Sequence, residues 1–330
     1  MRGTAACALA FAPDVTSALL SRPGAVPADP PDVGVAAHYG DPYAEQRALS
    51  AGSALVDLSH RPVLRVAGPD RLSWLHSLLT QHLTALGPGE WTQALALSPQ
   101  GHVEHHLSLV DDGTQLLAHV EPGTLGPLVE FLERMRFMLR VEIEDVTSSY
   151  AVVHQAGVDR LLPRAALAAV EAPLAGVGAY EALRVAARRP RLGLDTDHRT
   201  IPHEVGWLGS AVHLDKGCYR GQETVARVYN LGRPPRRLVL LHLDGSDSEL
   251  PTSGDPVQLD GRDVGRVGTA VRHHELGPLA LAVVKRQVPD DAALTAGPVA
   301  ASIDAEPAFE SPVSPARQAA AAREGLLRRR

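Results

Sequence analysis

The sequence predicts an α+β body followed by a small antiparallel β-barrel. Two observations carry this prediction. Residues 92–120 read as three short strands joined by tight turns, with helical segments before and after them. From Arg237 onward, short strands are separated by turns rich in Gly and Asp, without helical periodicity. Antiparallel strands with separated helices disfavour a doubly wound parallel sheet.

Local signals justify the elements of the body in order. Asp41 followed by Pro42 favours the start of a helix, which is expected to end near Gly52. Short strands are expected at 54–58 and 62–67. The remaining expected elements are a helix over 70–79 capped by Asp70, strands at 92–98, 102–110 and 114–120, a helix over 124–138 and a strand over 140–145.

The domain boundaries follow from shifts in composition. Residues 1–36 are expected to be a disordered lead-in because they contain many prolines and little apolar periodicity. The α+β region then covers 37–232, and the linker is the Gly-Arg-Pro-Pro segment at 232–235. The barrel is expected over 237–289, with strands at 237–243, 256–259, 263–272 and 279–285. Residues 290–330 are expected to be a disordered tail rich in Ala and Pro.

Composition limits the classes of function. The 330 residues are 45% hydrophobic, enough for a sizeable core in two or three domains. The net charge of −6 offers no global field for a polyanion, so no direct, stable nucleic-acid binding is expected. Cys7 and Cys218 do not form a disulfide framework, and no apolar stretch approaches a membrane span. We therefore expect a cytoplasmic protein with no membrane partner.

The best candidate for chemistry is a short motif around one cysteine. Cys218 stands between two cations and two glycines, and nearby positive charge with exposed loop backbone favours the nucleophilic thiolate. The alternative is a small buried apolar residue, which is the common fate of a free cysteine. The motif comprises Lys216, Gly217, Cys218, Tyr219, Arg220, Gly221, Gln222 and Glu223. We expect Cys218 to be accessible and reactive, with Lys216 and Arg220 stabilising the thiolate.

A histidine-rich strand invites a metal hypothesis. On the strand expected at 102–110, His102, Glu104 and His106 share one face and His105 the other. A three-ligand site is geometrically conceivable, but no flanking cysteine or carboxylate arrangement completes a recognised metal pattern. No metal is expected.

Three motifs together resemble one superfamily. The cysteine motif, Lys-Gly-Cys-Tyr-x-Gly-Gln-Glu, resembles the signature of the folate-binding YgfZ family, whose relatives include the glycine-cleavage T-protein, an aminomethyltransferase. Residues 56–60, with 65–70 after them, look like the Asp-Leu-Ser-His and Gly-Pro-Asp elements near the start of that superfamily. Residues 201–207 are a third match. The resemblance covers about residues 37–290 and implies a folate-binding body followed by a barrel.

The resemblance implies tetrahydrofolate or a derivative as cofactor. Folate needs a hydrogen-bonding group for the pterin edge, an aromatic or apolar wall and cations for its carboxylates. The candidates for these contacts are Glu204, Trp207, Arg184, and Arg227 or Arg233 near the cysteine motif. Two alternatives stay open: Arg184 is a solvated charge, and Arg227, Arg233, Arg236 and Arg237 form a surface stripe.

The chain departs from the transferase pattern at two reactive positions. The Gly-Gly-Ile-x-Asp-Asp element of the T-protein looks like residues 101–106 here, where His105 and His106 replace the aspartates. An imidazole cannot supply the fixed negative charge that aminomethyl transfer requires. The Lys-x-Asp-Phe-x-Gly element matches residues 216–221, where Cys218 replaces aspartate. We therefore expect no authentic aminomethyltransferase activity.

Three functions compete on this basis. Resemblance to YgfZ implies a folate-binding accessory protein that supports iron–sulfur cluster assembly or repair, with effects on tRNA modification. Its partners would be folate and iron–sulfur proteins or their assembly machinery. The alternatives are a folate-dependent aminomethyltransferase of the glycine-cleavage type and an RNA-binding accessory factor, which the acidic balance disfavours.

Overall fold

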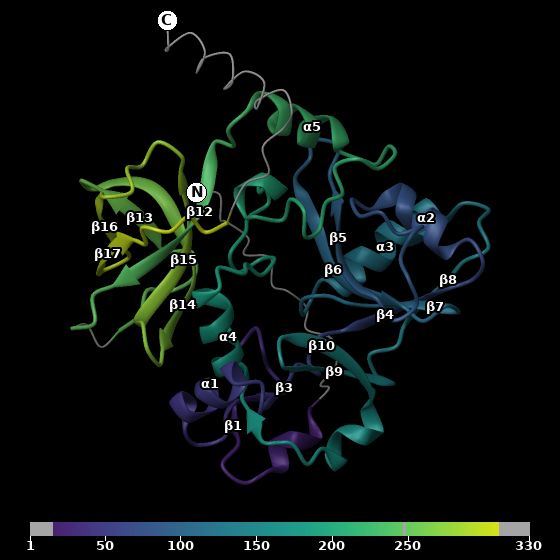
Figure 1. Cartoon of the computed structure of the whole chain (residues 1–330), viewed down its shortest axis with the longest axis horizontal. Coiled ribbons are helices and arrows are strands. Elements are labelled where there is room, and N and C mark those ends of the chain that lie inside the picture. Colours follow the sequence, from purple (N-terminus) through teal and green to yellow (C-terminus); the bar gives the residue numbers. More distant parts are fainter. Residues whose placement is uncertain (1–15, 247–248, 310–330) are drawn as a thin grey trace, which may run out of the picture. The chain divides into compact units, whose positions relative to one another are not determined.

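The structure is a computed structural model that describes residues 16–246 and 249–309. Its helices and strands (Figure 1) divide into two compact units that alternate along the chain. The first unit contains the described residues up to 67 together with 117–180, and the second contains 68–116 together with the described residues from 181 onward. No helix within these described ranges is long and apolar enough to cross a membrane.

The first unit is built on a four-stranded sheet of order β10-β9-β3-β11, in which only β11 runs parallel to its neighbour. The predicted helix start is confirmed, because Asp41 Oδ1 accepts hydrogen bonds from the amides of Tyr43 and Ala44 at 3.1 and 2.9 Å. The elements are η1 (Ala18–Ser21), β1 (Val26–Pro27), β2 (Ala36–His38), α1 (Pro42–Ser50), β3 (Leu55–Asp57), β4 (Val63–Ala67), α3 (Leu125–Arg136), β8 (Glu142–Asp145), β9 (Tyr150–Gln155), β10 (Val158–Pro163), η2 (Arg164–Ala169) and β11 (Leu174–Ala175).

The expected disordered lead-in is wrong for residues 16–36. Leu19 is fully buried and packs with Leu55 and Val153 of the first unit. The Ala28 amide donates to the Val35 carbonyl at 2.9 Å, and the short strands β1 and β2 pair. A composition rich in proline therefore concealed a segment that is fixed by one buried leucine and backbone hydrogen bonds. Residues 1–15, including Cys7, lie outside the described ranges.

The second unit holds the β5–β6 hairpin, two helices and the barrel. Strands β5 and β6 pair antiparallel, with Leu95 opposite His106 and Ala96 opposite His105. The predicted helix over 70–79 and the predicted strands at 92–98 and 102–110 are confirmed as α2 (Arg71–Leu78), β5 (Trp91–Leu97) and β6 (Val103–Asp111). The unit also contains η3 (Pro202–Glu204) and α5 (Gln222–Leu231), which were not predicted. The chain crosses between the units within β7 (Gln115–His119), the predicted strand at 114–120, and near the middle of α4 (Val177–Ala186).

A closed six-stranded barrel forms the rest of the second unit, as Figure 1 shows in green to yellow. Its strands follow the order β12-β15-β14-β13-β16-β17. They are β12 (Arg236–Leu243), β13 (Pro256–Leu259), β14 (Arg262–His273), β15 (Gly277–Lys285), β16 (Ala293–Ala296) and β17 (Val299–Ile303). The predicted fold class, an α+β body with a small antiparallel barrel, is confirmed.

The barrel continues to Ile303, beyond residue 289 where the sequence prediction ended it. Strand β17 pairs with β12 and β16 pairs with β13, so the last hairpin closes the barrel and removes two open sheet edges. Burial alternates along both strands, as expected for strands with one inward face. Short alanine-rich strands carry little β signal, which explains their assignment to a tail. Residues 310–330 lie outside the described ranges.

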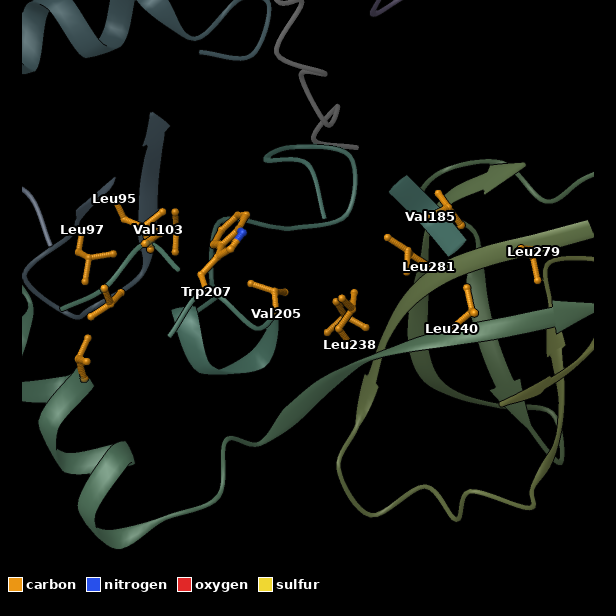
Figure 2. Packing of buried hydrophobic residues seen from close by; sticks show 14 of the residues in the cluster. Leu95, Leu97, Val103, Val185, Val205, Trp207, Leu238, Leu240, Leu279 and Leu281 are labelled. Atoms are coloured by element: carbon orange, nitrogen blue, oxygen red, sulfur yellow. The ribbon is translucent and has the colours of Figure 1, made fainter. Parts of the chain in front are cut away.

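One hydrophobic core joins the β5–β6 hairpin to the barrel within the second unit (Figure 2). Trp207, Val205 and Leu238 lie between the hairpin leucines and the barrel leucines. The cysteine motif contributes Tyr219 and α5 contributes Val225 to the same core. Because the motif, the hairpin and the barrel share buried side chains, their relative positions are fixed by packing.

Candidate functional site

Cys218 is exposed at the start of a loop that leads into α5. The next residue, Tyr219, is buried in the shared core, so the backbone beside the thiol is held by packing. A Cβ added at Gly217 would meet no atom within 4 Å, which leaves open space beside Cys218. The loop therefore presents the sulfur to solvent from a fixed frame, as the sequence prediction required.

Lys216 anchors the loop beneath the C-terminal end of α2. Its Nζ donates to the carbonyls of His76, Leu79 and Gln81, the last two at 2.5 and 3.2 Å. Burial lowers the pKa of Lys216 to about 8. The carbonyls at a helix C-terminus lack intrahelical partners and attract a cation. All three ammonium donors are engaged there, so Lys216 holds the loop in place. Its effect on the Cys218 thiolate stays a prediction.

Gly221 is required by a close approach of two backbones. Its φ is +82°, and a Cβ would lie 2.5 Å from the Ser98 carbonyl oxygen and 3.0 Å from the Gly101 Cα. Gly101 also has a φ of +82°, and its Cβ would lie 2.7 Å from the Thr224 side chain. The two glycines thus allow the motif to pack on the turn between β5 and β6.

The second motif cation, Arg220, pairs with Glu104 of β6 at 3.2 Å. Both side chains are more than a third exposed, so this ion pair contributes little to stability. The pairing links the cysteine loop to the strand on which the resemblance places the lost aspartates. Arg220 keeps its charge near the loop, whereas Glu104 offsets part of that charge.

The histidines of β6 face as the sequence predicted. Glu104 is exposed and His106 is partly exposed, while His105 is buried on the opposite face. Burial, with a smaller effect from Arg220, lowers the pKa of His105 to about 4, so the ring is neutral at pH 7. The His106 ring lies 4.6 Å from that of Trp207, centroid to centroid. Among the described residues, no group of three His, Cys, Asp or Glu side chains could hold a metal ion.

Arg184, expected to contact folate, is fully buried and entirely engaged within the second unit. Its five N–H groups donate to Glu181 at 2.5 and 2.8 Å, Asp195 at 2.7 Å, the Arg189 carbonyl at 3.0 Å and the Thr269 hydroxyl at 2.5 Å. Burial alone would lower the pKa of Arg184, but the two carboxylates raise it above its ordinary value. Because no donor remains for a ligand, the folate assignment of Arg184 is wrong, as is the alternative of a solvated charge.

Glu204 and Trp207 are also buried, and Glu204 has a partner that sequence reasoning missed. Both carboxylate oxygens of Glu204 accept hydrogen bonds from Arg236, at 2.9 and 2.7 Å, and Arg236 also binds Asp197. Because Arg236 is engaged with these two carboxylates, it is not part of the arginine surface stripe that the sequence left open as an alternative. No spacing signal could have found this pairing, because the partners lie 32 and 39 residues apart and only the fold brings them together. Arg227, on α5, keeps an exposed side chain.

Comparisons with known proteins agree with this architecture. Residues 236–310 match the family described as CAF17, C-terminal beta-barrel domain. A chloroplastic protein of Arabidopsis thaliana, named as a transferase, is 25% identical over 67% of this chain and 62% of its own length, so the chain spans less than two thirds of that relative. The aminomethyltransferase of Symbiobacterium thermophilum is 34% identical over 70% of this chain and 78% of its own.

A solved structure shows the same fold. The crystal structure of glycine cleavage system aminomethyltransferase T from Bartonella henselae aligns with a TM-score of 0.70 at 15% identity, covering 88% of this chain and 96% of that one. The molecule is thus a protein of the aminomethyltransferase fold with a CAF17-type C-terminal barrel. The chain belongs to the aminomethyltransferase family, and the resemblance to its YgfZ branch is confirmed.

Proposed function

We propose that this protein is a folate-binding accessory factor in which Cys218 supplies thiol chemistry for iron–sulfur cluster assembly or repair. The observation that carries the proposal is the exposed Cys218 on a loop fixed on both sides, by Lys216 beneath α2 and by Gly221 against the β5–β6 turn. A thiol that served only packing would be buried in such a frame. Room beside Gly217 suits the approach of a cluster, a sulfur carrier or a client protein.

Tetrahydrofolate as cofactor is supported by membership of the aminomethyltransferase family. The residues of the second unit fit part of this ligand. The partly exposed His106 ring, backed by Trp207, offers an aromatic surface, and the exposed Arg227 offers a cation for a carboxylate. Glu204 is held by Arg236, so we assign it and Trp207 to supporting this surface. Bound tetrahydrofolate would supply a one-carbon carrier or a reduced pterin.

Aminomethyl transfer is the second candidate, favoured by the 34% identity to an aminomethyltransferase. The β6 strand argues against it, because neutral, buried His105 cannot replace a fixed carboxylate. The nearest carboxylate on that strand, Glu104, faces away from His105 and pairs with Arg220. We propose that the chain does not perform this transfer at the rate of a true T-protein. Formation of methylene-tetrahydrofolate from an aminomethylated lipoyl carrier at such a rate would overturn this proposal.

Two measurements test the function and separate its parts. Anaerobic calorimetry should show that Arg227→Ala binds tetrahydrofolate more weakly than the wild type does. The control is Arg262→Ala, which removes an exposed cation from the barrel and should bind tetrahydrofolate as the wild type does. Cys218→Ser should bind folate normally but fail to restore iron–sulfur enzyme activity in cells that lack the native gene. Full complementation by Cys218→Ser would remove the thiol mechanism, and equal affinity of both arginine variants would remove Arg227 from the folate site.

The remaining parts of the proposal follow from these two. Partners would be iron–sulfur proteins or their assembly machinery, and any effect on tRNA modification would be indirect, through iron–sulfur enzymes. Direct RNA binding is not proposed, because the net charge of −6 offers no field for a polyanion. The cytoplasmic location stays a prediction.

A further inference from the structure

The C-terminal end of α3, a helix labelled in Figure 1, carries an apolar patch on the surface of the first unit. Phe137 is 90% exposed and Met138 is 86% exposed, and both follow directly after the helix. Met135 and Leu139 are exposed to 43% and 42%. If a fully exposed side chain of this kind offers about 200 Å², these four residues, the α3 patch, expose roughly 500 Å². Apolar patches of this size mark interaction sites on soluble proteins.

The backbone at Phe137 has a conformation that phenylalanine rarely adopts. Its φ is +48°, in the region that favours glycine, and its ring gains no burial within the fold in return. The opposite face of α3 already buries Leu128 and Leu132, so the α3 patch is additional to the apolar face that the helix uses for its own packing. A strained, exposed aromatic residue beside a helix that is already packed indicates a contact outside the chain.

The charges around the α3 patch are balanced in sign. Residues 130–142 contain three glutamates and three arginines. Glu133 and Arg136 form an exposed ion pair at 3.4 Å within the helix. Glu130 and Arg134 are exposed, and neither makes a hydrogen bond or ion pair with another residue of 16–246 and 249–309. Equal numbers of both signs provide no net field for an anionic membrane or for a partner of one charge.

The arrangement of these charges does suit a second copy of the same chain. Glu130 and Arg134 are four residues apart on α3, so they share one face of the helix. A twofold axis beside that face places Glu130 of each copy opposite Arg134 of the other, so that both charges find a partner twice. The α3 patch is thus complementary to itself in charge as well as in its apolar character.

We propose that the α3 patch is the interface of a homodimer, in which a second copy of the chain covers Phe137 and Met138 across a twofold axis. Glu130 and Arg134 pair between the copies at the rim of this apolar contact. Two facing patches would bury about 1,000 Å² of apolar surface, near the lower limit for specific interfaces. The dimer is therefore weak, with an expected Kd of about 10–100 µM. The interface belongs to the first unit, whereas Cys218 belongs to the second.

Sedimentation velocity of the full chain, over concentrations that span the expected Kd, tests the dimer. The wild type should change from one chain to two as its concentration rises. Phe137→Asp should raise the Kd at least roughly tenfold, because the dimer would have to bury a carboxylate. The matched control is Leu276→Asp in the turn between β14 and β15 of the second unit. Leu276 is also an exposed apolar residue, at 48%, and its substitution should leave the Kd unchanged.

Charge reversal tests the twofold pairing. Glu130→Arg and Arg134→Glu should each raise the Kd of dimerisation at least roughly threefold, because like charges then face each other. An equimolar mixture of these two variants should return to within about threefold of the wild-type Kd, because each reversed side chain then faces an opposite charge.

Three results would overturn the proposal. The first is a single chain at every concentration, and the second is a dimer whose Kd is the same in Phe137→Asp. The third is a mixture of the two charge variants that dimerises no better than either variant alone. Binding of the monomer to phosphatidylglycerol vesicles, lost in Phe137→Asp, would assign the α3 patch to a lipid surface instead. Circular dichroism and thermal melting establish that each variant is folded, since all the substituted side chains are exposed.

Discussion

Replacing Arg184 by methionine tests whether this residue is structural or belongs to a ligand site. The change removes a guanidinium whose five N–H groups are engaged and leaves two buried carboxylates, Glu181 and Asp195, without their main counter-charge. Removing one partner of a buried ion pair typically costs about 3–5 kcal/mol. Methionine fills most of the vacated volume, so a cavity adds little.

The magnitude lies at the lower end of that range, because both carboxylates keep other donors. Asp195 still accepts from the amides of Arg191 and Thr269, at 2.8 and 2.7 Å. Glu181 still accepts from Arg191 Nη1 at 2.9 Å. We therefore expect Arg184→Met to lower the free energy of unfolding by about 3 kcal/mol at pH 7.

The assay is urea denaturation of the full chain, in which the stability of Arg184→Met is compared with that of Arg227→Met. Arg227 is exposed, so the same substitution there should change stability by less than about 0.5 kcal/mol. Calorimetry under native conditions should find that Arg184→Met retains the folate affinity of the wild type. A loss of stability below about 1 kcal/mol together with loss of folate binding would refute the structural role and return Arg184 to the ligand site.

Three further predictions concern the surroundings of Cys218. Gly221→Ala should lower the free energy of unfolding by about 2–4 kcal/mol, because the added Cβ would lie 2.5 Å from the Ser98 carbonyl oxygen on a backbone with φ +82°. Gly217→Ala adds a Cβ in open space and should cost less than about 1 kcal/mol. Equal losses for the two variants in denaturant melts would contradict the packing described. The lowered pKa of His105, about 4 when folded against 6.5 unfolded, means that the unfolded chain binds more protons between these values. The contribution of neutral His105 to the free energy of unfolding is therefore complete above pH 6.5 and about 2 kcal/mol smaller at pH 5. His105→Gln should flatten the measured dependence of stability on pH by that amount. An unchanged slope would show that the ring is not buried as described. Arg220→Gln should change the free energy of unfolding by less than about 0.5 kcal/mol, because the ion pair of Arg220 with Glu104 is solvated. A change in the rate of Cys218 alkylation in this variant would therefore report the effect of the Arg220 charge on the thiol. An unaltered rate would exclude Arg220 from activating Cys218.

Local signals in the sequence determined the kinds of element and the position of the candidate site. The Asp41–Pro42 cap, the turn residues between the strands of residues 92–120 and the glycine-rich cysteine motif each act within a few residues of chain. Their physical effects, capping, positive φ and period-two burial, are local, so they can be read without a fold. The alternation of facing among Glu104, His105 and His106 followed for the same reason.

Only the tertiary structure decided which charges are available. Lys216 and Arg184 look in the sequence like ligands or activators, yet their partners are carbonyls and carboxylates supplied by distant segments, up to 140 residues away for Lys216. Arg236 and Glu204, 32 residues apart, became partners in the same way. The closing strands β16 and β17 were hidden because their pairing with β13 and β12, and not their alanine-rich composition, makes them strands. The availability of a charge and the pairing of a strand depend on contacts between segments far apart in the chain, and local propensity does not encode those contacts.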